Sequence, residues 1–125
     1  MVTAFAYSGR VWVSLNGSHR NPHAHQALMR HWHDRALAAI RATVCEPVTP
    51  PVVITATVRR VRNARQDAHN VLPTIKAGID AAVAAGIIPD DDDTVVSRLV
   101  IQAGPKAPTP TVEITIEHEE TWERA

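Results

Sequence analysis

Several things are scarce in this sequence, and each scarcity narrows the possibilities. Cys45 is the only cysteine, so an internal disulfide and a cysteine-built zinc site are both excluded, and a partly buried packing role is expected. No early segment is a long apolar run, because Arg10 and Arg20 interrupt it, which argues against a signal peptide or membrane span and predicts a cytoplasmic protein. Basic and acidic residues number thirteen each, so any affinity for nucleic acid has to come from a local cluster.

Aromatic residues and zinc motifs are scarce as well. Trp12, Trp32 and Trp122 are too scattered to form a base-stacking platform, and the first two are expected to pack in the core. Seven histidines are present, but the HExxH spacing is not. His31 and His33 are two residues apart, which places them on different sides of a helix and argues against a zinc site.

Apolar periodicity is what the sequence does have, and it predicts six elements. Alternation predicts strands at about 11–15, 52–59, 95–101 and 112–117, and apolar residues at helical spacing predict helices at about 24–41 and 71–85. Asn70 is expected to cap the second helix and Gly86 to end it. The order of elements predicts a small α+β domain over residues 1–125, with two helices packed on a mixed β-sheet.

Charged residues gather on both sides of the second predicted helix. The stretch "RRVRNARQDAHN" from Arg59 to Asn70 precedes it, and the run "DDDD" from Asp90 to Asp93 follows it. A helix of about 15 residues is roughly 22 Å long, so Asp67 and the aspartate run meet only if residues 87–93 return along the helix. Clustered carboxylates are typical ligands of Mg²⁺, and adjacent arginines suit phosphates, so the combination indicates chemistry on a phosphodiester.

The same residues resemble the RusA-type Holliday-junction endonucleases of bacteria and their phages. The resemblance rests on Arg65, Asp67 and Asn70, on "KAGID" from Lys76 to Asp80, and on Gly86, the Asp90–Asp91 pair and Val95–Val96. Two departures stand out. His69 occupies the place of the family's second Asp, and "VLPTI" makes the spacer before Lys76 longer than in the simplest version of the family pattern.

What the resemblance implies is a RusA-like fold and a homodimeric endonuclease that cuts four-way junctions and other branched DNA with Mg²⁺ or Mn²⁺. Such an enzyme serves DNA recombination and repair. The catalytic residues it implies are Asp67, Lys76 and Asp91. The implied metal ligands are Asp67, His69, Asp91 and Asp92. The implied DNA-binding residues are Arg59, Arg60, Arg62, Arg65 and Asn70. Under this resemblance, His69 can be a metal ligand, a group that positions water or only a neighbour of the site. The last catalytic aspartate is then either Asp91 or Asp92, and a gapless count from Asp80 favours Asp91.

Each signal also has a simpler interpretation. Asp67 to Asn70 can form only a turn and a helix cap, and the aspartate run can be a solvated loop. The arginines can protect a sheet edge from pairing with another sheet. Lys76 and Asp80 can be an ion pair on the helix surface. A non-catalytic module that binds branched DNA, in which His69 has replaced a required ligand, is the chief alternative to the nuclease. A structural protein whose aspartates hold an ion is the other. The joint occurrence of all the signals, in order, favours the nuclease.

Overall fold

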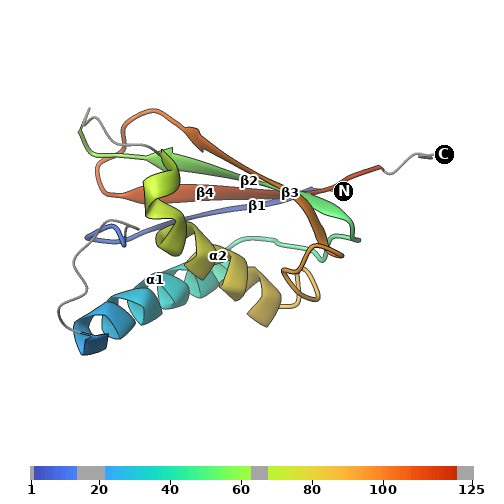
Figure 1. The fold of residues 1–125 in the computed structure, drawn as a ribbon, viewed down its shortest axis with the longest axis horizontal. Helices are drawn as coiled ribbons and strands as arrows, with labels where there is room; N and C mark the ends of the chain where they lie inside the picture. Colours follow the sequence, from blue (N-terminus) through green and yellow to red (C-terminus); the bar gives the residue numbers. More distant parts are fainter. Residues whose placement is uncertain (1, 14–21, 63–67, 121–125) are drawn as a thin grey trace.

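A four-stranded sheet in the order β1-β4-β2-β3 forms one layer, and two helices cover one of its faces (Figure 1). The computed structural model describes residues 2–13, 22–62 and 68–120. In chain order the elements are β1 (Val2–Ser8), α1 (Pro22–Ala42), β2 (Val52–Arg59), the 3₁₀ helix η1 (Ala68–Val71), α2 (Leu72–Ala84), β3 (Val96–Ala103) and β4 (Thr111–His118). Only β2 and β3 pair in parallel, while β4 is antiparallel to both β1 and β2. The predicted α+β fold with a mixed sheet is confirmed.

The core lies between the sheet and the helices. Alternate residues of β1, β2 and β4 are buried, as the period of two requires. The predicted stripe of α1 is buried at Trp32, Ala36 and Ile40, while Leu28 is half-buried. Trp12 stacks on Trp32 with ring centroids 5.8 Å apart, and Cys45 is a partly buried packing residue. None of the helices in the described parts of the chain is both long and apolar enough to cross a membrane.

The first predicted strand is wrong. Residues 11–13 form no strand, and the strand that precedes α1 is Val2–Ser8 instead. Alternation misled because β1 carries alanines on its outer face, which hides its period, whereas Val11 is 59% exposed and Val13 is buried. The backbone of Val13 bonds to a side chain rather than to a strand, since its N–H donates to Thr74 Oγ1 at 2.8 Å and its carbonyl accepts from that hydroxyl at 2.9 Å.

The two ends of α2 are formed in different ways. The predicted cap by Asn70 is wrong, because Asn70 lies inside η1 and the residue before α2 is Val71, which makes no side-chain cap. The 3₁₀ turn runs directly into the helix, so no separate capping residue intervenes. At the other end Gly86 adopts a positive φ of 80°. Its N–H donates to the Val83 carbonyl and that of Ile87 to the Ala82 carbonyl, which is the Schellman arrangement that favours glycine.

Gly78 allows α2 to approach β1 closely. The hydroxyl of Tyr7 reaches the helix and donates to the Thr74 carbonyl at 2.9 Å. Burial raises the pKa of this hydroxyl far above its usual value, so Tyr7 remains a neutral donor. A Cβ at position 78 would lie 2.2 Å from Tyr7 Oη, which leaves no room for a side chain.

Replacing Gly78 with alanine should therefore destabilise the protein, although alanine is the better helix former. Overpacking of a full core costs about 1–3 kcal/mol, which exceeds the gain of about 1 kcal/mol from helix propensity. The free energy of unfolding in urea measures the balance. In a Tyr7→Leu background, which removes the ring that Cβ would meet, the same replacement should cost less. A Gly78→Ala protein more stable than the wild type would contradict the close packing.

Candidate functional site

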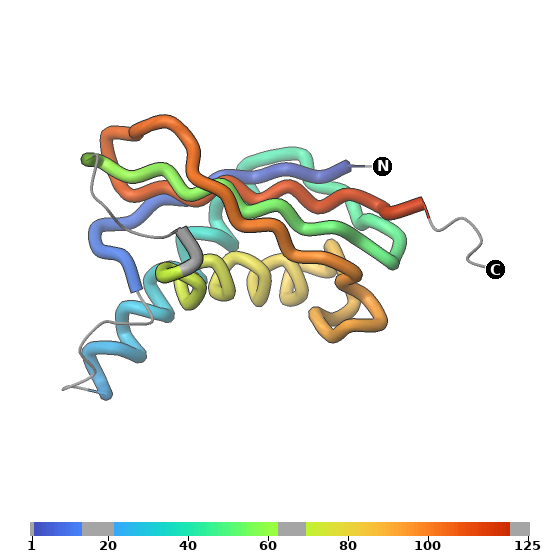
Figure 2. Tube along the Cα trace, turned by 45° about the horizontal axis from the view of Figure 1, so that its top comes forward, coloured from blue at the N-terminus to red at the C-terminus, as the bar shows by residue number. Residues whose placement is uncertain are grey.

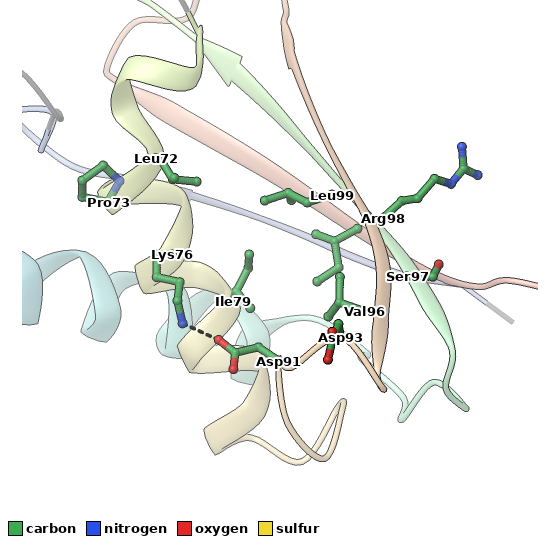
Figure 3. Close-up of a pocket in the computed structure, with 11 residues that line it drawn as sticks. Leu72, Pro73, Lys76, Ile79, Asp91, Asp93, Val96, Ser97, Arg98 and Leu99 are labelled. Carbon is green, nitrogen blue, oxygen red and sulfur yellow. Dashed lines mark hydrogen bonds and ion pairs between the residues drawn. The ribbon is translucent and has the colours of Figure 1, made fainter.

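A groove of about 580 Å³ lies between α2 and the edge strand β3 (Figure 3). The helix contributes one wall and the strand the other, while the loop between them crosses the end where Asp91 and Asp93 lie. Most of its lining is apolar and consists of Ile54, Leu72, Pro73, Ile79, Val96 and Leu99. Leu99 remains 39% exposed because α2 does not extend over β3. The groove thus combines apolar walls with the charged groups of Lys76, Asp91 and Asp93.

Lys76 joins two carboxylates at the rim of this groove. Its Nζ donates to Asp80 Oδ1 at 2.8 Å, one helical turn further along α2, and to Asp91 Oδ2 in the loop (Figure 3). Because Lys76 lies in the second turn of α2, the contact brings Asp91 back along the helix. The return of residues 87–93 that the acidic run required is therefore present. Lys76 and Asp91 were both predicted as catalytic, and the structure brings them together.

The ion pair between Lys76 and Asp91 stabilises the charged form of both side chains. The hydrogen bond from Lys76 is the main cause that lowers the pKa of Asp91. Partial burial acts to lower the pKa of Lys76, but the hydrogen bonds to Asp80 and Asp91 outweigh it and the pKa is raised. Both groups are thus ionised at neutral pH. The stabilisation from the pair is lost on acidification through the lowered pKa of Asp91 and on alkalinisation through the raised pKa of Lys76.

Asp90 and Asp92 bond within the turn that leads into β3. Asp92 Oδ1 accepts from the N–H of Thr94 at 3.0 Å and from its hydroxyl, and these bonds lower the pKa of Asp92. Its carbonyl accepts from the N–H groups of Val95 and Val96. Asp90 Oδ1 accepts from the N–H of Asp91 at 2.7 Å. Of the two candidates for the last catalytic aspartate, Asp91 faces the lysine and Asp92 holds the turn.

Arg59 holds the loop between β3 and β4 against the end of β2. Its guanidinium pairs with Glu113 at 3.2 Å and donates to the carbonyls of Pro105 and Lys106, each at 3.1 Å. The same loop is tied by the N–H of Gly104, which donates to the Val58 carbonyl at 2.9 Å. Arg59 is therefore occupied by contacts within the protein.

Further basic side chains lie at the same end of the sheet. Arg60 is half-buried and Arg62 exposed where β2 ends, and Lys106 is exposed in the loop that Arg59 holds. Figure 2 shows the end of β2 beside this loop. The sequence analysis did not select Lys106, because a lone lysine in a proline-rich loop carries no signal. Only the docking of that loop on β2 places it with the arginines.

Two of the predicted site residues, Asp67 and Arg65, lie outside the described residues. His69 belongs to η1, but its side chain is not described. Asn70 is half-buried in η1, which lies against β3. Among the side chains that the structure describes, no three from His, Cys, Asp or Glu are grouped so that they could hold a metal ion. The predicted approach of Asp67 to Asp91 stays a prediction.

Comparisons of the sequence with models of known protein families and with curated proteins find no match. The resemblance to the RusA-type endonucleases thus depends on the motif residues themselves. Among these residues, the structure shows that Lys76 contacts both Asp80 and Asp91, and the contact with Asp91 joins α2 to the loop that follows it.

Proposed function

We propose that this protein is a Mg²⁺-dependent endonuclease that cuts branched DNA, as the RusA-type resolvases do. The observation that carries the proposal is the contact between Lys76 and Asp91. These residues are 15 positions apart and lie on different elements, yet they meet at the rim of one groove, and both belong to the motif that the resemblance requires. An ionised carboxylate beside an ammonium group is a pairing that phosphodiester hydrolysis can use.

The charge state of each residue suits a defined task. Asp91 has a lowered pKa, so its hard carboxylate oxygens are available to a divalent cation at neutral pH, and Asp67 is its proposed partner ligand. A bound Mg²⁺ supplies charge neutralisation at the phosphate and a nucleophilic hydroxide at neutral pH. Lys76 remains protonated, so it serves as an electrostatic stabiliser of the developing negative charge and not as a base.

The proposed DNA-binding surface is the basic end of the sheet, with Arg60 and Arg62. Arg65, outside the described residues, is a further proposed DNA-binding residue. Backbone phosphates are neutralised there, which positions the strand without reading its sequence. Asn70 of η1 lies between this end and α2 in the chain. A homodimer follows from the substrate, because a four-way junction with twofold symmetry requires two symmetric cuts.

Arg62 and Arg59 should respond differently to replacement. Arg62→Ala removes an exposed charge, so the slope of log affinity against log salt should fall by about 0.9 for duplex DNA. Arg59→Ala should leave that slope nearly unchanged, but it should lower the free energy of unfolding by about 1–3 kcal/mol because three contacts to the β3–β4 loop and β4 are lost. Fluorescence titrations at several salt concentrations, with urea unfolding of each variant, separate the two. A flattened slope for Arg59→Ala would place that residue on the DNA.

The direct test is incubation of the purified protein with a labelled four-way junction and a linear duplex of the same length. Cutting of the junction is expected with Mg²⁺ or Mn²⁺ and should stop with a chelator, whereas Ca²⁺ should allow binding without efficient cutting. Retention of the junction without cutting under every condition would favour the non-catalytic module. The absence of both binding and cutting would overturn the proposal.

A further inference from the structure

We infer that Asp80 is a positioning residue that keeps the ammonium group of Lys76 beside Asp91 when Asp91 also binds a cation. The inference rests on the proposed function, since it assigns a task to a residue next to the proposed catalytic pair. It starts from one contact, the 2.8 Å hydrogen bond from Lys76 Nζ to Asp80 Oδ1. Asp80 belongs to the motif, but the resemblance implies no chemical role for it.

The geometry makes Asp80 the fixed partner and Asp91 the variable one. Asp80 and Lys76 lie four residues apart on α2, so the helix backbone sets the distance between their side chains. Asp91 belongs to the loop between α2 and β3 and approaches from outside the helix (Figure 3). Lys76 therefore keeps a partner on its own helix even if the loop carboxylate is drawn elsewhere.

Charge explains why that second partner matters. Without a divalent cation, Asp91 attracts the ammonium group strongly. When Asp91 ligates Mg²⁺, its charge is shared between two cations, and the like charges of the ammonium group and Mg²⁺ repel at short range. Lys76 is a long, flexible side chain that is 49% exposed, so it would turn into solvent unless another anion retained it. Asp80 is the only carboxylate besides Asp91 with an ion pair to Lys76 among the described residues.

The experiment compares Asp80→Asn and Asp80→Glu with the wild type. With enzyme in excess over the junction and Mg²⁺ saturating, Asp80→Asn should lower the single-turnover rate about tenfold with junction affinity unchanged, because orientation of the ammonium group is lost while DNA binding is not. Asp80→Glu keeps a carboxylate at the same spacing and should restore the rate to within about threefold. Glu117→Gln removes one exposed negative charge from β4, away from the cluster, and should match the wild type. Equal loss in Asp80→Asn and Asp80→Glu, or none in either, would overturn the inference.

A second readout does not depend on cutting. The ¹⁵N order parameter of the Lys76 ammonium group, measured without and with Mg²⁺, reports how firmly the side chain is held. In the wild type and in Asp80→Glu it should stay high after Mg²⁺ is added, whereas in Asp80→Asn it should fall. An equally high order parameter in Asp80→Asn with Mg²⁺ would exclude the positioning role. If the wild type cuts no junction, the proposed function fails, and this measurement still decides whether Asp80 retains Lys76.

Discussion

Replacing Asp91 with asparagine is expected to reduce junction cutting by several orders of magnitude while leaving junction binding intact. The side chain keeps its size but loses the charge that pairs with Lys76 and that we propose binds the metal. Each factor of ten in rate corresponds to about 1.4 kcal/mol of transition-state stabilisation, so losing one ligand charge is enough for a large effect. In metal-free buffer, affinity for the junction should hold or rise, because a negative charge that repels phosphate is gone.

Asp92→Asn is the matched control for this replacement. Asp92 is the neighbouring residue, and it bonds to Thr94 through a single oxygen, Oδ1, which an asparagine side chain can still present. Cutting by Asp92→Asn should stay within a few-fold of the wild type. Single-turnover cleavage and a gel-shift assay on the same junction measure both properties. Wild-type cutting by Asp91→Asn, or a greater loss in Asp92→Asn than in Asp91→Asn, would show that the aspartates are wrongly assigned.

Replacing Trp32 with alanine should have the largest effect on stability. Its side chain is completely buried, and its indole N–H donates to the Val11 carbonyl at 2.8 Å. The ring packs edge-on against Tyr7 and is stacked with Trp12. Truncation of a large buried aromatic residue costs about 3–5 kcal/mol, which is a large part of the stability of a small domain. A fall of that size in the free energy of unfolding is the expected result.

Urea denaturation followed by circular dichroism measures this change, provided that the m-value stays constant. Val44→Ala serves as a control, since Val44 is 90% exposed and its truncation should change stability by no more than about 0.5 kcal/mol. If the free energy of unfolding of Trp32→Ala were within about 1 kcal/mol of the wild-type value, which is close to the range for surface substitutions, Trp32 would not be a packed core residue.

The parts of the fold with a strong period were predictable from the sequence. Strand β2 is bounded as expected, because four apolar residues alternate there without interruption, and α1 shows its buried stripe at every fourth residue. Strand β1 was missed because alanine on its solvent side blurs the contrast between faces. Alternation of apolar and polar residues reveals a strand when only one of its faces is apolar. It does not reveal a strand whose outer face also carries weakly apolar residues.

The candidate site was predictable in its residues but not in its contacts. Spacing along the chain selected Lys76, and a gapless count from Asp80 favoured Asp91 over Asp92 without showing what either carboxylate contacts. That distinction depends on the turn formed by Asp92 with Thr94, which directs the neighbouring carboxylate towards α2. Likewise, the sequence placed Arg59 and Arg62 in one basic cluster. In the structure, Arg59 donates hydrogen bonds to carbonyls of the loop after β3, and no such bond is described for Arg62. Both cases turn on backbone carbonyls and amides, whose positions a residue pattern does not specify.

The position of β4 between β1 and β2 has a consequence for how the chain reaches its native state. The strand that is last along the described chain forms the centre of the sheet, and its partner β1 is the first. During synthesis on a ribosome, β1 therefore has no strand to pair with until β4 has emerged, because among the described strands β2 pairs only with β3 and β4, and β3 only with β2. Pairings of such high sequence separation close large loops and slow folding. Until then the backbone N–H and C=O groups along β1 have no partner strand, although α1 can already pack on its apolar face.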